Sequence, residues 1–379
     1  MIPFNKPSMI GNEADYINQA VSKGHHISGN GPFTKKCEHL LEAALGGGCR
    51  VLLTTSCTSA LEMAALLLDL QEGDEVILPS FTFVSTANAF LLRGCVLKFA
   101  DVDPDSMNIS LAEVERLTTK ETKVIVPVHY GGVSCDMDAL KSFCAEREIY
   151  LVEDAAQALG SSYNGKPLGT FGELATFSFH ETKNIICGEG GALVINDPKY
   201  FERAEIIREK GTNRSQFFRG QVDKYTWVDI GSSYVMSDML AAYLFAQLEN
   251  MDEINKLREE AFSYYVEQLR PLEEQGLIKL QKHLPKTNGN GHLFYLLTQS
   301  SEQQKDMLEY LNEQGVNAVF HYLPLHTSNR GVQFSNLCGA LPITEKQSYQ
   351  LVRLPMYHKI SRDELDQVIQ TIYQFYKGS

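Results

Sequence analysis

TFSFHETKNIICGEGG, residues 176 to 191, is the stretch from which the fold can be predicted. Its first residues belong to the apolar run Ala175–Phe179, which is typical of a buried strand. Lys183 lies in the polar segment that follows, and glycines then allow a sharp turn toward a second apolar strand, Ala192–Asn196. A lysine held at the end of a strand can lose solvation, which lowers its pKa and allows it to attack a carbonyl carbon. Lys183 is therefore a candidate nucleophile, although most lysines in glycine-rich loops are solvated surface groups.

The region before this stretch alternates short apolar runs with helical stretches such as Ser59–Leu70. The predicted strands are Arg50–Leu53, Glu75–Pro79, Val96–Ala100, Lys123–Val128 and Tyr150–Glu153. Several are apolar on both faces, as strands are when helices cover both sides of a parallel sheet. The alternation predicts right-handed βαβ units in an α/β/α sandwich, with ligands bound beyond the carboxyl ends of the strands.

The pattern changes near residue 237. Ser237 and Asp238 are expected to cap a long helix that reaches about Leu269, with Pro271 just after it. We therefore expect a large α/β domain with an N-terminal arm in residues 1–250.

A smaller C-terminal α+β domain is expected in residues 251–379. Its shorter strands and helices are assigned to Leu293–Thr298, Glu302–Gln314, Val316–Phe320 and Arg362–Tyr376. The linker His283–Gly291 is polar and rich in turn residues, so an exposed loop is expected there.

The overall composition is that of a globular protein, with 44% hydrophobic and 21% charged residues among 379. A net charge of −13 argues against general binding to nucleic acids or to an anionic membrane surface. No apolar run approaches the roughly 20 residues that span a bilayer, and the N-terminus lacks a signal-peptide pattern. The eight cysteines include no CxxC pair, so we expect free thiols in a reducing cytoplasm and no metal site.

A run of hydroxyl-bearing residues, TTSCTS at 54–59, lies between a predicted strand and a helix. Hydroxyls and free backbone N–H groups at a helix N-terminus suit a phosphate dianion. Simple capping of the helix by Ser or Thr is the alternative interpretation.

The strand YLVEDAAQ, residues 150–157, ends in acidic residues that include Asp154. A carboxylate next to a pyridine nitrogen keeps that nitrogen protonated, because an opposite charge favours the charged form. The protonated ring is then an electron sink. Gln157 lies about one helical turn further on and could reach a phenolic oxygen of the same ring. A helix cap is the alternative role for the acid.

Two further positions complete the predicted cofactor site. Ser178 and His180 share one face of their strand, so the Ser178 hydroxyl could bind the phosphate while Lys183 closes over the ring. Phe83, in PSFTF, could stack on a flat cofactor, and core packing is its alternative role. Acid, phosphate loop, serine and lysine together indicate pyridoxal phosphate. Signatures of nucleotide-binding loops, hydrolase nucleophile elbows and zinc proteases are absent.

A series of landmarks in order resembles the DegT/DnrJ/EryC1/StrS family of sugar aminotransferases over essentially the whole chain. The landmarks are SCTSALEMA, PSFTFVSTANA, VPVHYGG, VEDAAQALG, FSFHETKN, GEGGALV and FHYLPLH. The resemblance implies fold type I of the pyridoxal phosphate enzymes, similar to aspartate aminotransferase, and a homodimer with shared active sites. It also implies that L-glutamate and a nucleotide-linked keto sugar are the substrates.

The resemblance assigns cofactor roles to individual residues. Lys183 matches the lysine bound to the cofactor, Asp154 the partner of the ring nitrogen, and Gln157 the neighbour of the phenolic oxygen. Phe83 matches the aromatic residue that covers the ring. The phosphate-binding positions are matched by Cys57, Thr58 and Ser178, with Ser56 beside them.

One motif departs from the family. Many members have asparagine in YN[LM][ST]D, where it reaches the phosphate of the partner subunit, but this chain has Val235 there. Asn213, Arg214 or Ser233 are candidates to replace it.

The segment 208–224 carries five basic residues and two acidic ones, a local balance of +3, and its arginines could grip a diphosphate. A solvated loop is the alternative. The candidate substrate-binding residues are His180, Asn213, Arg214, Arg219, His321 and Tyr322.

The stretch 207–238 resembles family members that aminate C4 of TDP-4-keto-6-deoxyglucose to give the galacto product. Amination at C3 and a gluco-configured 4-amino product are the nearest alternatives. A lyase that uses Cys187 and a non-enzymatic regulator are more distant ones.

Overall fold

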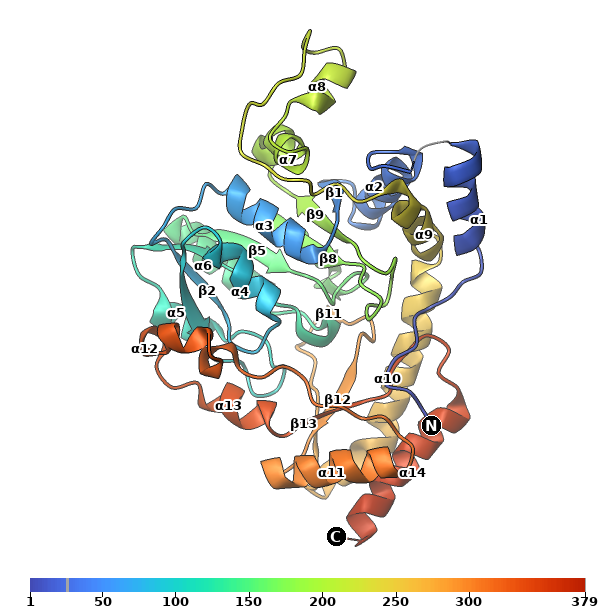
Figure 1. Cartoon of the computed structure of the whole chain (residues 1–379). Helices are drawn as coiled ribbons and strands as arrows, with labels where there is room; N and C mark the ends of the chain where they lie inside the picture. The colour runs from blue at the N-terminus through green and yellow to red at the C-terminus, as the bar shows by residue number, and fades with distance from the viewer. Residues whose placement is uncertain (25–26, 379) are drawn as a thin grey trace.

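The computed structural model describes residues 1–24 and 27–378, built around a seven-stranded sheet of order β1-β9-β8-β5-β4-β2-β3 (Figure 1). Its strands are β1 Arg50–Thr54, β2 Glu75–Pro79, β3 Val96–Ala100, β4 Thr122–Ile125, β5 Tyr150–Asp154, β8 Leu174–Ser178 and β9 Gly191–Ile195. From β3 to β8 all neighbouring strands are parallel, whereas β9 is antiparallel to both β8 and β1. The predicted α/β fold with a mostly parallel sheet is confirmed.

Helices cover both faces of this sheet, because alternate strand residues point to opposite sides. Val51 and Leu53 belong to one buried cluster, and Leu52 between them belongs to another. The first face is covered by α2 Pro32–Ala44, α5 Leu111–Leu117, α6 Met137–Arg147 and α9 Asp238–Leu248. The second face is covered by α3 Cys57–Leu67, α4 Val84–Leu91 and α7 Phe201–Arg208. Helix α3 begins two residues before its predicted start, because Ser56 caps it.

The long helix predicted from residue 237 to about residue 269 is wrong in two respects. It is divided into α9 and α10 Met251–Glu274, with a break at Glu249 and Asn250. Pro271 lies inside α10 rather than after it. The helix ends instead near Gly276, whose φ of +73° is a left-handed conformation that favours glycine.

The C-terminal part contains a three-stranded sheet of order β10-β12-β13, packed against long helices at the lower end of Figure 1. Its elements are β10 Lys279–Leu280, β12 Phe294–Leu297, β13 Leu351–Leu354, α11 Ser301–Glu313 and α14 Arg362–Gly378. Ile2 belongs to the same buried cluster. The segment Val316–Phe320 forms only isolated bridges, between Ile2 and Val316 and between Val319 and Arg353, among the residues described. The domain boundary at residue 250 stays a prediction.

The linker 283–291 is not an exposed loop throughout. It forms β11 Thr287–Asn288, which pairs with β6 Ser162–Tyr163, and β6 pairs in turn with β7 Lys166–Pro167. Asn290 is only 1% exposed, because its side-chain amide donates to the carbonyl oxygens of Gln157 and Leu159. The polar composition of the linker predicted exposure throughout and gave no sign that Asn290 would be buried.

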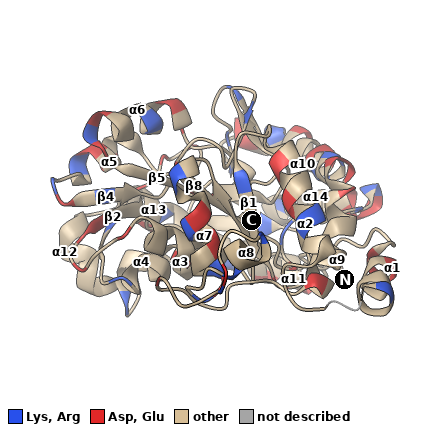
Figure 2. Cartoon of the chain, turned by 90° about the horizontal axis from the view of Figure 1, so that it is seen from above, with Lys and Arg blue, Asp and Glu red and all other residues tan. Residues whose placement is uncertain are grey.

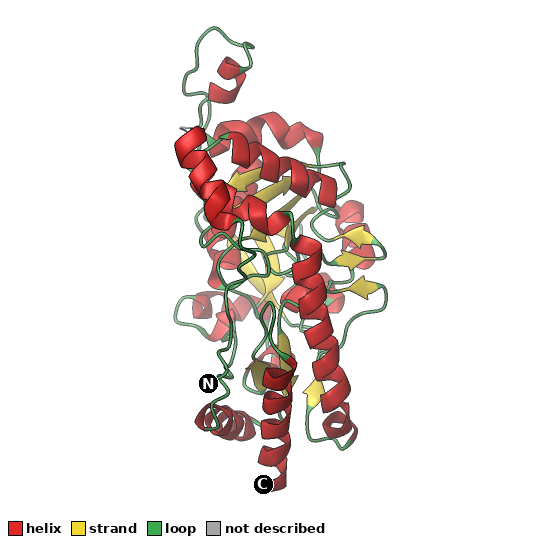
Figure 3. Ribbon diagram, turned by 90° about the vertical axis from the view of Figure 1, so that its right-hand side faces the viewer, coloured by secondary structure: helices red, strands yellow, loops and turns green. Residues whose placement is uncertain are grey.

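The remaining helices connect these layers. They are α1 Glu13–Asn18, η1 Gln19–Lys23, η2 Tyr130–Gly132, η3 Pro198–Tyr200, α8 Arg214–Phe218, η4 Leu325–Thr327, η5 Gly331–Phe334, α12 Ser335–Cys338 and α13 Pro342–Ser348. Helix α8 projects from the body in Figure 1, and Figure 3 shows both termini near the opposite end. Basic and acidic side chains are interspersed over α5, α6 and α10 (Figure 2). Within residues 1–24 and 27–378, no helix is long and apolar enough to cross a membrane.

Candidate active site

The predicted cofactor residues meet where parallel strands end at one edge of the large sheet. Asp154 is the last residue of β5, and Ser178 is the last residue of β8. Strand β1 runs in the same direction as β8, because β9 is antiparallel to both, so residues 56–58 follow β1 at the same edge. Gly191 pairs with both Thr54 and Ser178 and holds these strand ends together.

The candidate phosphate loop is the N-terminus of α3. Ser56 caps the helix, because its side-chain oxygen accepts a hydrogen bond of 3.0 Å from the Ser59 N–H. The Thr58 hydroxyl donates to Ser85 Oγ at 2.7 Å. The first N–H groups of a helix have no intrahelical acceptor, which suits them to an anion. A Cβ on Gly191 would lie 2.3 Å from the Cys57 nitrogen, so only glycine permits this close approach.

Asp154 is a buried carboxylate, 5% exposed, with defined hydrogen-bond donors. Thr86 of α4 donates to its Oδ2 at 2.7 Å, and the Ala156 N–H donates to its Oδ1 at 3.2 Å. Thr82 lies 2.9 Å from the Thr86 hydroxyl and completes the chain. A carboxylate held in this way can pair with a protonated ring nitrogen. Thr86 was not singled out from the sequence, although it lies in the landmark PSFTFVSTANA, four residues after Thr82.

Glu153, the neighbour of Asp154, faces the other side of the sheet and is fully buried. It accepts hydrogen bonds from the backbone N–H groups of Gly169, Phe171 and Gly172. His129 Nε2 lies 3.0 Å from the same carboxylate. Glu153 therefore holds a loop, and Asp154 alone faces the candidate site.

Gln157 connects the end of β5 to a group of aromatic rings, Phe83, His321 and Tyr322, which we call the aromatic wall. Its Oε1 accepts from the Gly131 N–H at 2.7 Å, which directs its Nε2 to donate to the Tyr322 hydroxyl at 3.0 Å. The ring of Tyr322 stacks on His321 with centroids 3.7 Å apart. Phe83 is 55% exposed, with its ring 6.2 Å from that of Tyr322, so one face is open to a ligand.

Lys183 is partly buried, and its amine has no hydrogen bond or ion pair among the described residues. Burial lowers the pKa of Lys183 below 10.5, although the nearby Cys57 and Asp154 act to raise it. Burial also raises the pKa of the Cys57 thiol above 9.0, so this thiol stays protonated at neutral pH. Lys183 is consequently the more available nucleophile.

Cys187 does not resemble a reactive thiol. It is 2% exposed, and its sulfur contacts the Glu189 carbonyl and Met236. Burial raises its pKa above 9.0, which disfavours the nucleophilic thiolate.

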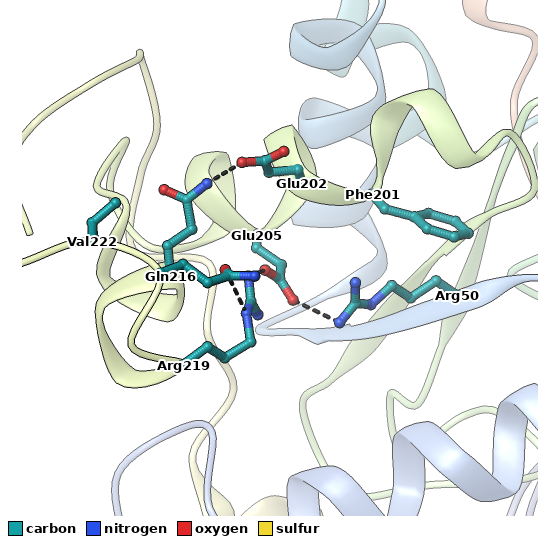
Figure 4. A pocket seen from close by; sticks show the side chains of 8 residues that line it. Arg50, Phe201, Glu202, Glu205, Gln216, Arg219 and Val222 are labelled. Atoms are coloured by element: carbon teal, nitrogen blue, oxygen red, sulfur yellow. Dashed lines mark hydrogen bonds and ion pairs between the residues drawn. The ribbon is translucent and has the colours of Figure 1, made fainter.

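Three of the candidate substrate residues, Asn213, Arg214 and Arg219, lie on or beside the projecting segment around α8. Asn213 accepts the Thr226 N–H at 2.7 Å, and Arg214 lies over the ring of Phe218 at 5.1 Å. Arg219 forms an ion pair of 2.8 Å with Glu205, which also binds Arg50 (Figure 4).

Arg208, counted with the basic segment in the sequence, is 1% exposed and has a structural role. Its guanidinium binds Glu38 at 2.7 Å and the Asn30 side chain at 2.6 Å. Val235 lies against Gly29, where an added Cβ would approach Val235 Cγ1 to 1.9 Å. His180 is bound locally, with its Nδ1 2.9 Å from the Thr182 hydroxyl.

The residues present fit pyridoxal phosphate. Four features occupy one sheet edge. They are a lysine amine that has no hydrogen bond or ion pair within the described part of the chain, a buried carboxylate, a hydroxyl-rich helix N-terminus and a glycine-lined approach. Fold and site together define a fold type I pyridoxal phosphate enzyme. A sequence model of the DegT/DnrJ/EryC1/StrS aminotransferase family matches residues 7–373, and the chain belongs to this family. Its cofactor is pyridoxal 5′-phosphate, and its class is sugar aminotransferase.

The chain is similar to known proteins over nearly all of its length. It is 30% identical to GDP-perosamine synthase of Escherichia coli O157:H7 over 377 residues, which are 99% of this chain and 98% of that protein. It is 31% identical to the pleiotropic regulatory protein of Geobacillus stearothermophilus over 92% of this chain and 90% of that protein. The crystal structure of the aminotransferase TlmJ from Streptoalloteichus hindustanus matches with a TM-score of 0.90 and 28% identity, over 100% of this chain and 99% of that one.

Proposed function

We propose that the protein transfers the amino group of L-glutamate to C4 of TDP-4-keto-6-deoxy-D-glucose. The products are TDP-4-amino-4,6-dideoxy-D-galactose and 2-oxoglutarate. The amine of Lys183 carries the transamination part of the proposal. It makes no hydrogen bond or ion pair with any residue that the structure describes, and it is close enough to Asp154 at the sheet edge for the two charges to interact. The sugar rests on the resemblance of residues 207–238 to the TDP-4-keto-6-deoxyglucose 4-aminotransferase of the enterobacterial common antigen pathway.

The residues of the site divide the reaction among them. When bound, pyridoxal phosphate supplies an electron sink for the carbon that loses its proton. Asp154 holds the ring nitrogen protonated, because its carboxylate favours the positive form. The Lys183 amine takes the α-proton of glutamate and later returns a proton to C4 of the sugar. Gln157 binds the phenolic oxygen, and Phe83 covers one face of the ring.

The phosphate of the cofactor is assigned to the start of α3 and the end of β8. Ser56, Cys57 and Thr58 offer hydroxyls and free backbone N–H groups, and Ser178 adds a hydroxyl. The glutamate and sugar sites are assigned to residues around this cradle. His180 follows Ser178, and its N–H donates to the Ser178 hydroxyl oxygen at 3.4 Å. His321 stacks on Tyr322, which accepts a hydrogen bond from Gln157.

We also assign a homodimer to the functional state. The segment around α8 exposes large apolar side chains, including Trp227 at 79% and Phe218 at 69% exposure. A second copy of the chain would cover them, because isolated proteins seldom leave such a group in water. In that dimer Asn213, Arg214 and Ser233 are the candidates for a phosphate contact across the interface, and Arg219 is a candidate for the substrate diphosphate.

The decisive experiment supplies the enzyme with glutamate and either TDP-4-keto-6-deoxyglucose or its GDP-linked counterpart. NMR of the product should show an axial amino group at C4 from the TDP sugar. An equatorial nitrogen, amination at C3 or a preference for the GDP sugar would select the alternative products.

The transaminase assignment has its own test. Lys183→Ala should abolish the absorbance near roughly 420 nm expected for lysine-bound pyridoxal phosphate. A band that persists in the variant, or a wild-type protein that takes up no cofactor, would contradict the assignment and favour a non-enzymatic role.

A further inference from the structure

A buried polar cluster adjoins Lys183 and is not used by the chemistry described above. It consists of Asn184, Asn255, Asn290 and His292, which are between 1% and 9% exposed. We call these residues the Asn184 cluster. They come from the Lys183 loop, helix α10 and the segment before β12, which lie far apart in the sequence.

Asn184 is bonded through every polar atom of its side chain. Its Nδ2 donates to Asn255 Oδ1 at 2.9 Å and to the Asn290 carbonyl oxygen at 2.8 Å, and its Oδ1 lies 3.0 Å from His292 Nδ1. Its own carbonyl oxygen accepts from the Ser8 hydroxyl at 3.0 Å. The backbone next to Lys183 is thereby fixed from several directions.

These contacts determine which nitrogen of His292 carries the proton. A backbone carbonyl can only accept, so the Asn184 atom that faces Asn290 must be the amide nitrogen. The atom that faces His292 is then the amide oxygen, which can only accept, so His292 Nδ1 is the donor.

His292 stays neutral in this environment. Burial holds its pKa well below 6.5, and the neighbouring Lys183, Arg258, His321 and Arg353 all act in the same direction. A second proton, on Nε2, would add positive charge among these groups. The neutral Nδ1–H form therefore persists around neutral pH.

The same cluster also holds Gln157, the residue proposed to bind the phenolic oxygen of the cofactor. Asn290 donates through Nδ2 to the Gln157 carbonyl oxygen at 2.9 Å, while its Oδ1 accepts from the backbone N–H of His292 at 3.1 Å. A Cβ on Gly132 would come within 2.0 Å of Asn290 Oδ1, so the packing is tight. Lys183 and Gln157 are thus attached to a common support.

We propose that His292 is a positioning residue that aligns Lys183 with the cofactor cradle through its hydrogen bond to Asn184. The proposal rests on the proposed role of Lys183 as the lysine that binds the cofactor. His292 itself does not contact the reacting atoms. The hydrogen bond from His292 to Asn184 limits the orientations of the Lys183 loop. The amine is therefore already oriented toward the carbonyl carbon of the cofactor when the cofactor binds.

The test compares three substitutions in the full-length chain, stripped of cofactor and then supplied with pyridoxal phosphate. His292→Asn places an amide donor near the position of Nδ1, His292→Gln places it near Nε2, and His292→Phe removes it. The rate at which Lys183 forms its bond to the cofactor is followed by absorbance near roughly 420 nm. This rate should fall about tenfold in the Gln and Phe variants. The Asn variant should stay within about threefold of the wild type.

His358→Phe is the matched control, because His358 is also buried, at 7%, in the C-terminal part and makes no hydrogen bond to the Lys183 loop within residues 1–24 and 27–378. It should leave the rate unchanged. Equal rates for the Asn and Gln variants would overturn the positioning role, even if all variants melt at lower temperature. The comparison of the Asn and Gln variants tests the positioning role even if His292→Phe fails to fold. If the Lys183→Ala variant keeps the absorbance band near roughly 420 nm, the proposed function on which the inference rests is refuted instead.

Discussion

The side-chain amide of Gln157 donates a hydrogen bond of 3.0 Å to the hydroxyl of Tyr322, and this contact joins the end of β5 to the aromatic wall. The two residues are 165 positions apart in the sequence. Burial raises the pKa of Tyr322 above 10.0, and the nearby Asp154 adds to this effect, so the hydroxyl keeps its proton. It accepts from Gln157 and can donate its own hydrogen toward a bound ligand.

Removing this hydroxyl tests its role. Tyr322→Phe should lower kcat/KM about tenfold, the effect of one buried hydrogen bond, while the cofactor is retained. Tyr349→Phe is the control, because Tyr349 is 45% exposed and should have no effect. Steady-state kinetics with both substrates provide the measurement, and equal values for the two variants would argue against a role for Tyr322.

The hydrogen bond from Thr86 to Asp154 should influence how well the cofactor ring acts as an electron sink. Asp154→Asn removes the charge that keeps the ring nitrogen protonated, so kcat should fall by about two orders of magnitude or more. Thr86→Val removes only one hydrogen bond to that carboxylate, and a loss of about fivefold is expected. Thr371→Val, in which the lost bond is to the Gln367 carbonyl within a helix, is the control. A larger loss in the Thr86 variant than in the Asp154 variant would be inconsistent with this order.

The lowered pKa of Lys183 predicts how the stability of the cofactor-free chain depends on pH. Below the folded-state pKa, both states are protonated and burial of the charge destabilises the fold. Between that value and 10.5 the unfolded state binds more protons, so stability rises with pH. Lys183→Met should therefore be more stable than the wild type at neutral pH, and the difference should shrink as the pH approaches 10.5.

Urea unfolding across this range provides the measurement. Lys120→Met is the control, since the Lys120 side chain is 89% exposed and should show no such trend. A difference between Lys183→Met and wild type that is independent of pH would contradict the burial of a charged amine.

Glu153 should be needed for folding rather than for chemistry. Glu153→Ala leaves three backbone N–H groups and His129 without their acceptor, so a loss of about 3–5 kcal/mol is expected. Burial alone would raise the pKa of Glu153, but the bonds from His129 and the loop lower it below 4.5. The stabilisation is therefore present above pH 4.5 and is lost as the pH falls through the lowered pKa.

Chemical denaturation at neutral pH and at acidic pH checks this expectation. The exposed Glu313→Ala is the control. A stable Glu153→Ala variant that has lost only its catalytic activity would reverse the roles assigned to Glu153 and Asp154.

Gly191 should be required for the phosphate cradle. A methyl group at this position would meet the Cys57 nitrogen and the Ser56 carbonyl carbon at 2.3 Å, so Gly191→Ala must push β9 and α3 apart. We expect the affinity for pyridoxal phosphate to fall at least about tenfold, while the weaker binding of pyridoxal changes less. Gly48→Ala meets nothing within 4 Å and is the control. Equilibrium dialysis with both ligands measures the ratio, and an equal loss for both would locate the damage outside the phosphate site.

Local patterns predicted the regular elements well. The apolar runs that became β2, β3 and β5 lie within one residue of their observed bounds, because strands buried on both faces need continuous apolar residues. The interruption of the helix at Glu249 and Asn250 was not predicted, since these residues carry no strong helix-breaking signal. The passage of α10 through Pro271 was missed for the opposite reason, because proline usually ends a helix.

The sequence by itself determined the family, the cofactor and the residues around Lys183, because consecutive residues carry these motifs. Only the tertiary structure decided which polar groups meet across long separations. It connected Thr86 to Asp154, Tyr322 to Gln157, and His292 to Asn184. It also showed that Glu153 faces away from the site. The physical reason is that a hydrogen bond depends on distance and direction in space, and a local sequence pattern gives neither for residues that lie far apart along the chain.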